Sequence, residues 1–428
     1  MSKWFYKIVL FFVRPLVRLR LRWRARREPE YGERLAERFG AVPDEVVQGS
    51  VWFHTVSAGE TMAAAPLILE LCARFPDVPF LVTTMTPTGS AQVRKKLGDQ
   101  VTHMYAPYDF PDVVMKFFDR VQPRAMILME TELWPNWIAT ARSRQVPVML
   151  VNARLSEKSA RGYARLSNLV REMLQRLTLI ACQSRAHRDR FIGLGAHAQR
   201  VVVAGSVKYD QQLPSDFAER VANLRSRAGM SVNDRIWIAA STHPGEEEIV
   251  IEAHKRVCAR FPDTKLVLVP RHPVRTEAVL ELVAKAGFKA VRESALVRES
   301  QIARVLVGDV MGSLQYLYGL ADIAFVGGSL VKVGGHNPIE PALCELPIVC
   351  GPYQYNFTDI MDPLLEAGGL ACVTGHEALA QTVGDWFADP EARYRAAQAA
   401  TEVVSANRGA RDRVRELVST HIAGTVAE

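Results

Sequence analysis

Short apolar runs alternate with segments of helical spacing along most of the chain. In the first half these runs span residues 51–56, 80–85, 125–130, 147–153, 179–183 and 201–205. After a polar stretch at 208–217 the alternation restarts. In the second half the runs span residues 235–240, 265–270, 303–309, 323–326, 348–350 and 370–374. Apolar strands separated by helices are typical of parallel sheets that are covered on both faces.

The pattern predicts an α/β protein with two Rossmann-like domains that face each other across a cleft, joined by a linker near residues 206–216. Amphipathic helices are expected at 376–388 and 390–422. The predicted divisions are an N-terminal segment 1–40, a first domain 41–210, a second domain 211–405 and a C-terminal helix 406–428 that packs back on the first domain. Ligands of such sheets bind beyond the carboxyl ends of the strands, so the cleft is the expected site.

The N-terminal segment combines an apolar run with a cluster of arginines. Residues 4–17 are apolar apart from Lys7, Arg14 and Pro15, and residues 18–27 have the sequence RLRLRWRARR. A membrane-spanning helix needs about 20 apolar residues, so this run is short. Aromatic residues followed by basic ones favour a helix in the membrane interface or a shallow anchor. The charge follows the apolar run, which argues against a secretory signal and predicts attachment to the cytoplasmic face of a membrane.

Charge and cysteine content narrow the class of protein further. Residues 1–40 hold eleven Lys or Arg and four Glu, out of 53 basic and 46 acidic residues, so the remainder is formally neutral. A body without net charge argues against a nucleic-acid-binding surface. The six cysteines form no CxxC pair, which indicates reduced thiols rather than disulfides. No His or Cys pair has the spacing of a zinc site, so neither a metal nor another cofactor is expected.

The stretch 322–352 places glycine pairs at 327–328 and 334–335, in a loop between a predicted strand and a predicted short helix. Three residues set the start of that helix: Asn337 at the cap, Pro338 at the first position and Glu340 at the third. Backbone N–H groups near the glycines and at the helix N-terminus favour an anion such as a nucleotide phosphate. The alternative is a plain strand-to-helix turn with a capping box.

Polar side chains follow several predicted strands in the first half. Glu60 either forms a capping box with Ser57 or, kept ionised by the positive helix end, accepts a proton from a substrate hydroxyl. Glu130 and Glu132 follow a buried strand. Alternation places them on opposite sides, so one is expected in a site and the other in the scaffold. Lys208 either contacts a phosphate or developing negative charge, or is a solvated linker residue.

Two strand ends in the second half carry groups suited to anions. Arg271 and His272 directly follow a strand, and the planar guanidinium is the better candidate for phosphate or carboxylate. His272 alone indicates an ordinary hydrogen-bonding residue. The turn 311–313 opens a helix and offers free N–H donors to an anion. The chain has no DxD pair to hold a metal–diphosphate, which a donor with a single phosphate does not need.

A series of motifs lies at the strand ends. In the first half they are HTVSAGE (54–60), TTMTPTGS (83–90), METELWPN (129–136), NARLS (152–156) and GSVKYD (205–210). In the second half they are STHPGEE (241–247), VPRHP (269–273), VGDVMG (307–312), FVGGSLV (325–331) and GGHNPIEPA (334–342). Together they resemble the bacterial 3-deoxy-D-manno-octulosonic acid (Kdo) transferases of lipopolysaccharide synthesis, over nearly the whole chain.

The resemblance implies an inverting glycosyltransferase of the B type at the cytoplasmic face of the bacterial inner membrane. Its donor would be CMP-Kdo and its acceptor a lipid A precursor, lipid IVA. By the same resemblance Glu60 is the general base, and Glu130 and Lys208 stabilise the transition state. The implied CMP-binding residues are Pro270, Arg271, Met311, Gly312, Ser313, Asn337, Pro338, Ile339 and Glu340, with Glu340 suited to the ribose hydroxyls. Ser313 departs from the family pattern, which commonly has an acidic residue there.

Two other functions are compatible with the same pattern. One is a B-type glycosyltransferase or sugar-nucleotide epimerase that uses a UDP-sugar. The other is a membrane-tethered assembly protein that binds no nucleotide. The collection of polar residues at so many strand ends disfavours the assembly protein.

Overall fold

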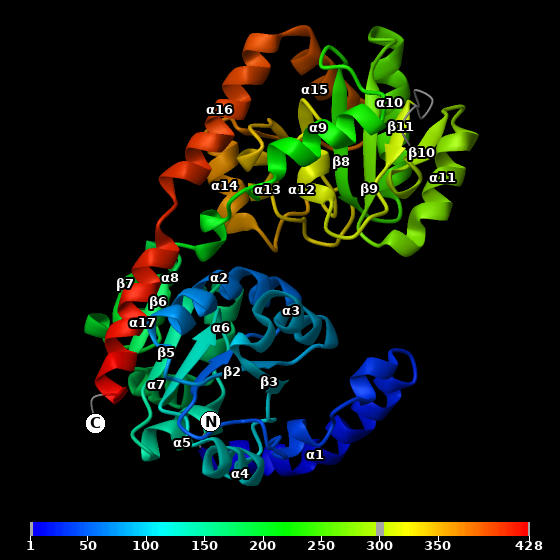
Figure 1. Cartoon of the computed structure of the whole chain (residues 1–428). Coiled ribbons are helices and arrows are strands. Elements are labelled where there is room, and N and C mark those ends of the chain that lie inside the picture. Colours follow the sequence, from blue (N-terminus) through cyan, green and yellow to red (C-terminus); the bar gives the residue numbers. More distant parts are fainter. Residues whose placement is uncertain (1–2, 297–303, 427–428) are drawn as a thin grey trace. The chain divides into compact units, whose positions relative to one another are not determined.

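The computed structural model describes residues 3–296 and 304–426, which form two compact α/β units (Figure 1). Unit 1 contains residues 1–210 and 408–428, and unit 2 contains residues 211–407. The chain therefore leaves unit 1, builds unit 2 and returns to unit 1 with its last helix. The described strands of each unit form one sheet whose pairings are all parallel, as the alternation of strands and helices predicts.

The sheet of unit 1 has seven strands. Their order is β3 (Thr102–Tyr105), β2 (Phe80–Thr84), β1 (Val51–His54), β4 (Ala125–Met129), β5 (Val148–Ala153), β6 (Leu179–Cys182) and β7 (Val201–Val203). The central strands are buried on both faces because helices cover both. The helices of this unit are α1 (Lys3–Ala25), α2 (Ala58–Arg74), α3 (Pro87–Leu97), α4 (Pro111–Val121), α5 (Pro135–Ser143), α6 (Glu157–Ala164), α7 (Ser167–Arg176), α8 (Arg185–Gly193) and α17 (Ala410–Val426).

Strand β1 shows how the two faces of this sheet are filled. Trp52 packs in one core with residues of α4, α5 and α7, and its indole lies 4.7 Å from that of Trp137. The next residue, Phe53, points into the opposite core with residues of α2, α3 and α17. The contribution of α17 to that core comes from Val414, Val418 and Ile422, all fully buried. Their spacing of four residues places them on one helix face.

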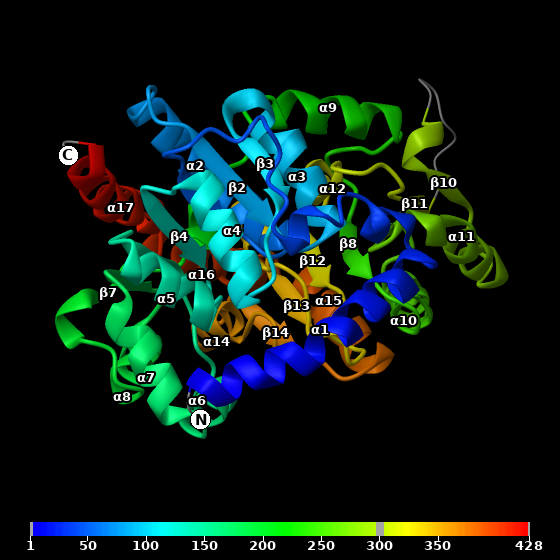
Figure 2. The same cartoon turned by 90° about the horizontal axis from the view of Figure 1, so that it is seen from below.

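Helix α1 is a long helix (Figure 2). Several of its contacts with the rest of unit 1 are polar. The Tyr6 hydroxyl donates to the Asp109 carboxylate at 2.9 Å, and Arg14 forms an ion pair with Asp112 at 2.9 Å. The guanidinium of Arg18 lies over the ring of Phe39. The large apolar side chains that this helix leaves more than half exposed are Phe11, Phe12, Leu16, Leu19 and Trp23.

None of the helices in the described residues combines the length and apolar character that crossing a membrane would need.

The sheet of unit 2 also has seven strands. Their order is β10 (Ala290–Arg292), β11 (Val305–Val307), β9 (Lys265–Pro270), β8 (Ile236–Thr242), β12 (Ile323–Val326), β13 (Ile348–Cys350) and β14 (Leu370–Cys372). Its helices are α9 (Phe217–Arg227), α10 (Glu246–Arg260), α11 (Thr276–Lys285), α12 (Leu314–Tyr318), α13 (Ile339–Leu343), α14 (Thr358–Glu366), α15 (His376–Ala388) and α16 (Pro390–Ala406). Trp237 and Ile238 of β8 point into separate cores on the two faces.

The structure differs from the sequence prediction in three elements. Strands β3 and β10 were not predicted, because each is short and carries polar or charged residues in place of an apolar run. The predicted helix 390–422 is two helices, since the chain breaks after α16 and restarts at Ala410. Gly409 at this break is in the left-handed region, with a φ of +86°.

Candidate active site

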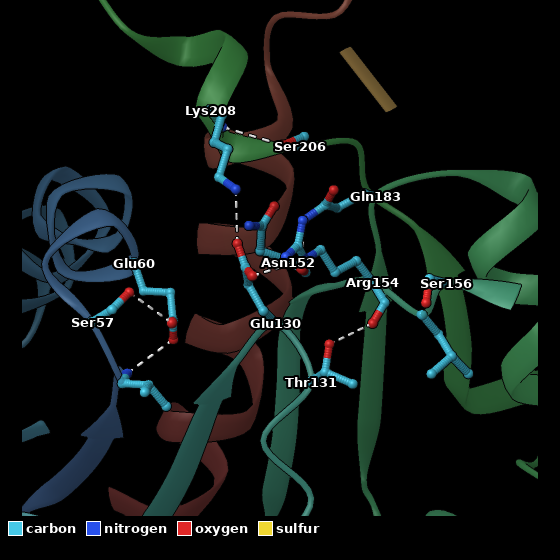
Figure 3. A network of polar contacts seen from close by, with 12 residues as sticks. Ser57, Glu60, Glu130, Thr131, Asn152, Arg154, Ser156, Gln183, Ser206 and Lys208 are labelled. Atoms are coloured by element: carbon cyan, nitrogen blue, oxygen red, sulfur yellow. Dashed lines mark hydrogen bonds and ion pairs between the residues drawn. The ribbon is translucent and has the colours of Figure 1, made fainter. Parts of the chain in front are cut away.

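Glu60 lies in the first turn of α2, directly after the turn that follows β1. Its Oε2 accepts a hydrogen bond from the Val56 N–H at 2.9 Å, and its Oε1 accepts one from the Ser57 hydroxyl at 3.0 Å (Figure 3). Ser57 is the N-cap residue, but its side chain accepts no bond from the helix N–H groups. The arrangement is therefore not a reciprocal capping box, because the Ser57 hydroxyl and the Val56 backbone N–H both donate to the Glu60 carboxylate.

The environment of Glu60 makes its carboxylate a better base than an ordinary glutamate. Burial is the main cause that raises the pKa of Glu60, and the carboxylates of Glu130 and Glu132 act in the same direction. The bonds from Val56 and Ser57 lower it, and the net pKa is about 7. The sequence led us to expect that the helix end keeps Glu60 ionised, and burial acts against this by raising the pKa. A carboxylate with a pKa near neutrality is suited to accept a proton at physiological pH.

Glu130 lies directly after β4 in a left-handed backbone conformation, with φ of +57°. Such a conformation is unfavourable for a non-glycine residue and recurs at functional sites. Its side chain is 12% exposed and forms two ion pairs, with Lys208 Nζ at 2.9 Å and with Arg154 Nε at 2.9 Å (Figure 3). The strand end therefore places one largely covered carboxylate between two cations.

Neighbouring strand ends hold these cations in place. Asn152, in β5, also has a positive φ, of +50°. Its side-chain oxygen accepts the N–H of Val207 at 3.2 Å, in the short 3₁₀ turn Val207–Asp210 that carries Lys208. Its backbone carbonyl accepts a bond from the Gln183 amide at 2.9 Å. These contacts tie the turn that bears Lys208 to the carboxyl edge of the sheet.

Alternation predicted that Glu132 lies on the side opposite to Glu130, and the structure does not follow this prediction. Strand β4 ends at Met129, and the left-handed conformation of Glu130 breaks the two-residue period. Glu132 accepts a bond from the Trp134 indole N–H at 2.9 Å, and burial raises its pKa. The charges of Glu130 and Glu132 both raise the pKa of Glu60.

The candidate donor-binding residues of unit 2 follow three strands of its sheet. Pro270 and Arg271 come at the end of β9, the turn 311–313 follows β11, and residues 337–340 come in the segment after β12. These strands and β8 are consecutive in the sheet order β11-β9-β8-β12. Since the strands are parallel, the carboxyl ends and the residues that follow them lie along one edge.

Helix α13 begins one residue later than predicted, at Ile339, so Pro338 occupies the cap position and Asn337 precedes it. The Asn337 side-chain oxygen still accepts the N–H of Ile339 at 3.1 Å, and its amide donates to Glu340 at 3.2 Å. Burial raises the pKa of Glu340, against the bond from Asn337 and the charge of Arg271. The segment therefore presents a partly desolvated carboxylate beside an arginine.

The turn 311–313 is less open to an anion than predicted. The Ser313 N–H donates to the Val310 carbonyl, so it is not a free donor. The Ser313 hydroxyl lies 2.7 Å from a carboxylate oxygen of Glu293, whose pKa burial raises. Gly312 has a φ of +89°, and Met311 is strongly exposed. A neighbouring carboxylate favours hydrogen-bond donors of a ligand over a phosphate at Ser313.

The glycine pairs do not offer their N–H groups to a ligand, so this part of the sequence prediction is wrong. The buried carboxylate of Glu246, at the start of α10, accepts the N–H groups of Gly328 at 2.7 Å, Ser329 at 2.9 Å and Leu330 at 2.8 Å. The N–H groups of the second pair, 334–335, both donate to the Gly328 carbonyl. The loop is therefore closed on itself and on Glu246.

Comparison with known proteins assigns the chain to a family. Residues 33–211 match the family model described as 3-deoxy-D-manno-octulosonic-acid transferase (kdotransferase). The 3-deoxy-D-manno-octulosonic acid transferase of Haemophilus influenzae is 38% identical over 427 residues, which cover 99% of both chains. The chain belongs to the Kdo transferase family. The family member of Bordetella pertussis is 35% identical, with 96% of this chain and 97% of that protein covered.

The fold of this Kdo transferase is also found among more distant proteins. The structure of MnaA from S. aureus with UDP superimposes with a TM-score of 0.56 at 12% identity, covering 88% of this chain and 97% of that chain. At this identity the likeness concerns the fold alone.

Two residues of this Kdo transferase site were missed by sequence reasoning. Arg154 pairs with Glu130, and the signal available was its place just after an apolar strand, in NARLS. Glu246 closes the glycine loop. It lies within the motif STHPGEE, but this role was not predicted, because a glutamate after Gly245 also suits the first turn of any helix. The N–H groups of the glycine loop that Glu246 accepts lie more than eighty positions away in the chain.

Proposed function

We propose that this member of the Kdo transferase family transfers Kdo from CMP-Kdo to a hydroxyl group of a lipid A precursor and releases CMP. The hydroxyl proton moves to Glu60 while the hydroxyl oxygen attacks the anomeric carbon of the sugar. The bond between that carbon and the phosphate oxygen breaks, and its electron pair leaves with CMP. Attack opposite the leaving group inverts the anomeric configuration.

The observation that carries this proposal is the Glu60 carboxylate beside the ion-paired Glu130. A base must be within reach of a hydroxyl and must be ionised part of the time at the working pH, and a pKa near 7 meets the second condition. Lys208 and Arg154 supply positive charge at the same strand ends. In the proposal Lys208 stabilises negative charge as the transition state forms, and Glu130 keeps it in position.

In unit 2 the proposed donor contacts are the cytidylate segments predicted from the resemblance. Arg271 suits the phosphate because its guanidinium forms paired hydrogen bonds with anionic oxygens. Glu340 suits the ribose hydroxyls, since a partly desolvated carboxylate accepts hydrogen bonds from them. The mechanism needs no metal or other cofactor, because the donor has one phosphate.

We also propose that α1 holds the protein at the cytoplasmic face of the bacterial inner membrane. The exposed aromatic residues of this helix suit the level of the lipid headgroups, and its arginines suit anionic lipids. This location brings the enzyme to an acceptor that is itself a phosphorylated lipid.

The proposed role of Glu60 predicts the effect of E60Q. The amide cannot accept the hydroxyl proton, so kcat is expected to fall by about 10²- to 10⁴-fold. The affinity for CMP is expected to stay within about twofold, because CMP contacts are proposed for unit 2. Turnover is measured by mass spectrometry of the product from CMP-Kdo and lipid IVA, and CMP affinity by calorimetry.

The matched control is E45Q, which makes the same change at an exposed glutamate of the same unit. It should retain full turnover. A kcat for E60Q within threefold of the native value would remove Glu60 from the mechanism.

CMP should raise the melting temperature of the native protein and UDP should not, since only a ligand that binds the native state stabilises it. The reverse result would favour a UDP-sugar enzyme.

A further inference from the structure

Three histidines of unit 2 come from three adjacent strand ends. His243 directly follows β8, His272 lies two residues after β9, and His336 lies in the segment after β12. Because β9, β8 and β12 are neighbours in the sheet, these segments meet at its carboxyl edge. His272 is exposed, and the other two are half-buried. Because His243 and His336 lie 93 positions apart in the chain, the sequence alone does not reveal this cluster.

The rings of the cluster are in direct contact. The Nε2 atoms of His243 and His336 lie 2.8 Å apart, and the two rings are parallel, with centroids 5.1 Å apart and planes at 7°. His272 packs edge-on against His243, with centroids 6.0 Å apart. In the contact between Nε2 atoms one ring must donate and the other accept. The neutral pair therefore has one Nδ1–H donor, and the other Nδ1 becomes a donor when the pair takes up one proton.

The surroundings of the pair favour an anion over a metal ion. Among residues 3–296 and 304–426, no three His, Cys, Asp or Glu side chains are arranged to hold a metal. The pKa of His336 is lowered to about 3, mainly by burial and in part by the charges of Arg271 and the other two histidines. The nearest carboxylates are engaged: Glu246 accepts backbone N–H groups, including that of His243, and Glu247 pairs with Arg275.

We propose that His243, His272 and His336 bind the carboxylate of the donor sugar. This inference rests on the proposed function. His272 adjoins Arg271, and His336 adjoins Asn337, so the cluster borders both segments proposed to bind cytidylate. In CMP-Kdo the sugar carboxylate is attached to the same carbon as the phosphate oxygen. A group that recognises this carboxylate must therefore lie next to the phosphate, which is where the histidines are placed.

The carboxylate supplies the negative charge that the cluster lacks. It accepts hydrogen bonds from the imidazole N–H groups, and the positive charge of Arg271 adds to the attraction. The cluster then distinguishes an acidic sugar from a neutral one on the same nucleotide, because a neutral sugar leaves these donors without an anionic partner.

The test separates the sugar carboxylate from the phosphate. In the native protein saturated with CMP, addition of free Kdo should shift the imidazole NMR signals of His243 and His336, and the methyl ester of Kdo should not. In H336Q and H243Q, the inhibition constant of free Kdo in the presence of CMP should rise about tenfold or more, while the Kd for CMP stays within threefold. Calorimetry with CMP alone measures the Kd for CMP, which tests binding of the phosphate and shows whether the variant is correctly folded.

H197Q, a change at an exposed histidine of unit 1, is the matched control and should behave as the native protein. H272Q provides a second variant at an exposed ring, with a smaller expected rise. Equal shifts with Kdo and its ester, or an unchanged inhibition constant in both H336Q and H243Q, would overturn the proposal. Loss of CMP affinity in step with Kdo affinity would assign the cluster to the phosphate instead. If the proposed function itself were wrong, the native protein would bind no CMP, which distinguishes that case from the results above.

Discussion

Glu60 combines two properties that usually exclude each other in a glutamate. Its carboxylate is held by two hydrogen-bond donors, which favour the ionised form, and it is desolvated beside two other carboxylates, which favour the protonated form. Desolvation prevails, so the pKa is raised to about 7. The result is a carboxylate that is fixed in orientation and still able to exchange a proton near neutral pH.

This pKa predicts a pH dependence of turnover. A general base works only when it is deprotonated, so kcat should rise by about tenfold for each pH unit below 7 and level off above it. An unperturbed glutamate would level off near pH 4.5 instead. The measurement is kcat from pH 5 to 8.5 at saturating substrate, with E45Q as the control that keeps the native profile. A profile that is flat from pH 5 to 7 would contradict the raised pKa.

Single residues were predictable from the sequence only where their neighbours in the chain position them. The places of Glu60 and Glu130 at strand ends follow from apolar runs that stop just before them. The left-handed conformation of Glu130 and the role of Glu246 did not follow, because both depend on partners that the fold brings from distant segments. The histidine pair was missed for the same reason, since 93 positions separate its members.

At the scale of elements, α1 differs from the other helices of unit 1 in what it leaves exposed. Its polar contacts with the body include those of Tyr6 and Arg14, and Leu21 is buried, whereas Phe11, Phe12, Leu16, Leu19 and Trp23 are more than half exposed. A helix of a soluble unit normally buries its apolar stripe. The exposed stripe therefore fits the proposed membrane surface.

The proposed membrane contact predicts that F11S/F12S weakens binding to vesicles. Loss of two exposed aromatic side chains removes apolar area that would enter the headgroup region, so the fraction bound to vesicles with 30% or so anionic lipid should fall about tenfold or more. Sedimentation with vesicles measures binding, and turnover of a detergent-solubilised acceptor checks that the site is intact.

The matched control is V232S, a change at an apolar side chain that is strongly exposed in unit 2. It should leave vesicle binding unchanged. Native binding by F11S/F12S would place the membrane contact elsewhere. Tyr6 and Arg14 are kept in these variants, so the packing of α1 on unit 1 is not the property under test.

At the scale of the whole chain, the parallel sheets were predictable because buried parallel strands are nearly continuous apolar runs. Strands such as β1, β4 and β8 are recognisable in the sequence as such runs. The edge strands β3 and β10 did not, since an edge tolerates polar residues. The boundary between α16 and α17 depends on Gly409, whose left-handed conformation no periodicity reveals.

The division into units predicts different behaviour for two fragments. Residues 211–407 contain a complete unit, so this fragment should fold cooperatively and bind CMP. Residues 1–210 lack α17, whose Val414, Val418 and Ile422 fill one core of unit 1. Burial of each such side chain contributes about 1.5–3 kcal/mol, a large share of a net stability of about 5–15 kcal/mol. Thermal unfolding followed by circular dichroism measures both fragments.

Adding residues 408–428 back to the first fragment through a short flexible linker is the control, and it should restore cooperative unfolding. If residues 1–210 alone unfold at the same temperature as unit 1 of the intact protein, α17 contributes no stability to that unit.

The return of the chain to unit 1 has a consequence for biosynthesis. During translation the residues of unit 2 are all available before α17 leaves the ribosome, so the unit begun second is the first that can reach its native state. The unit begun first keeps one apolar face of its sheet open until the final helix arrives. The half of the enzyme that bears Glu60 is thus completed only after α17 has been synthesised.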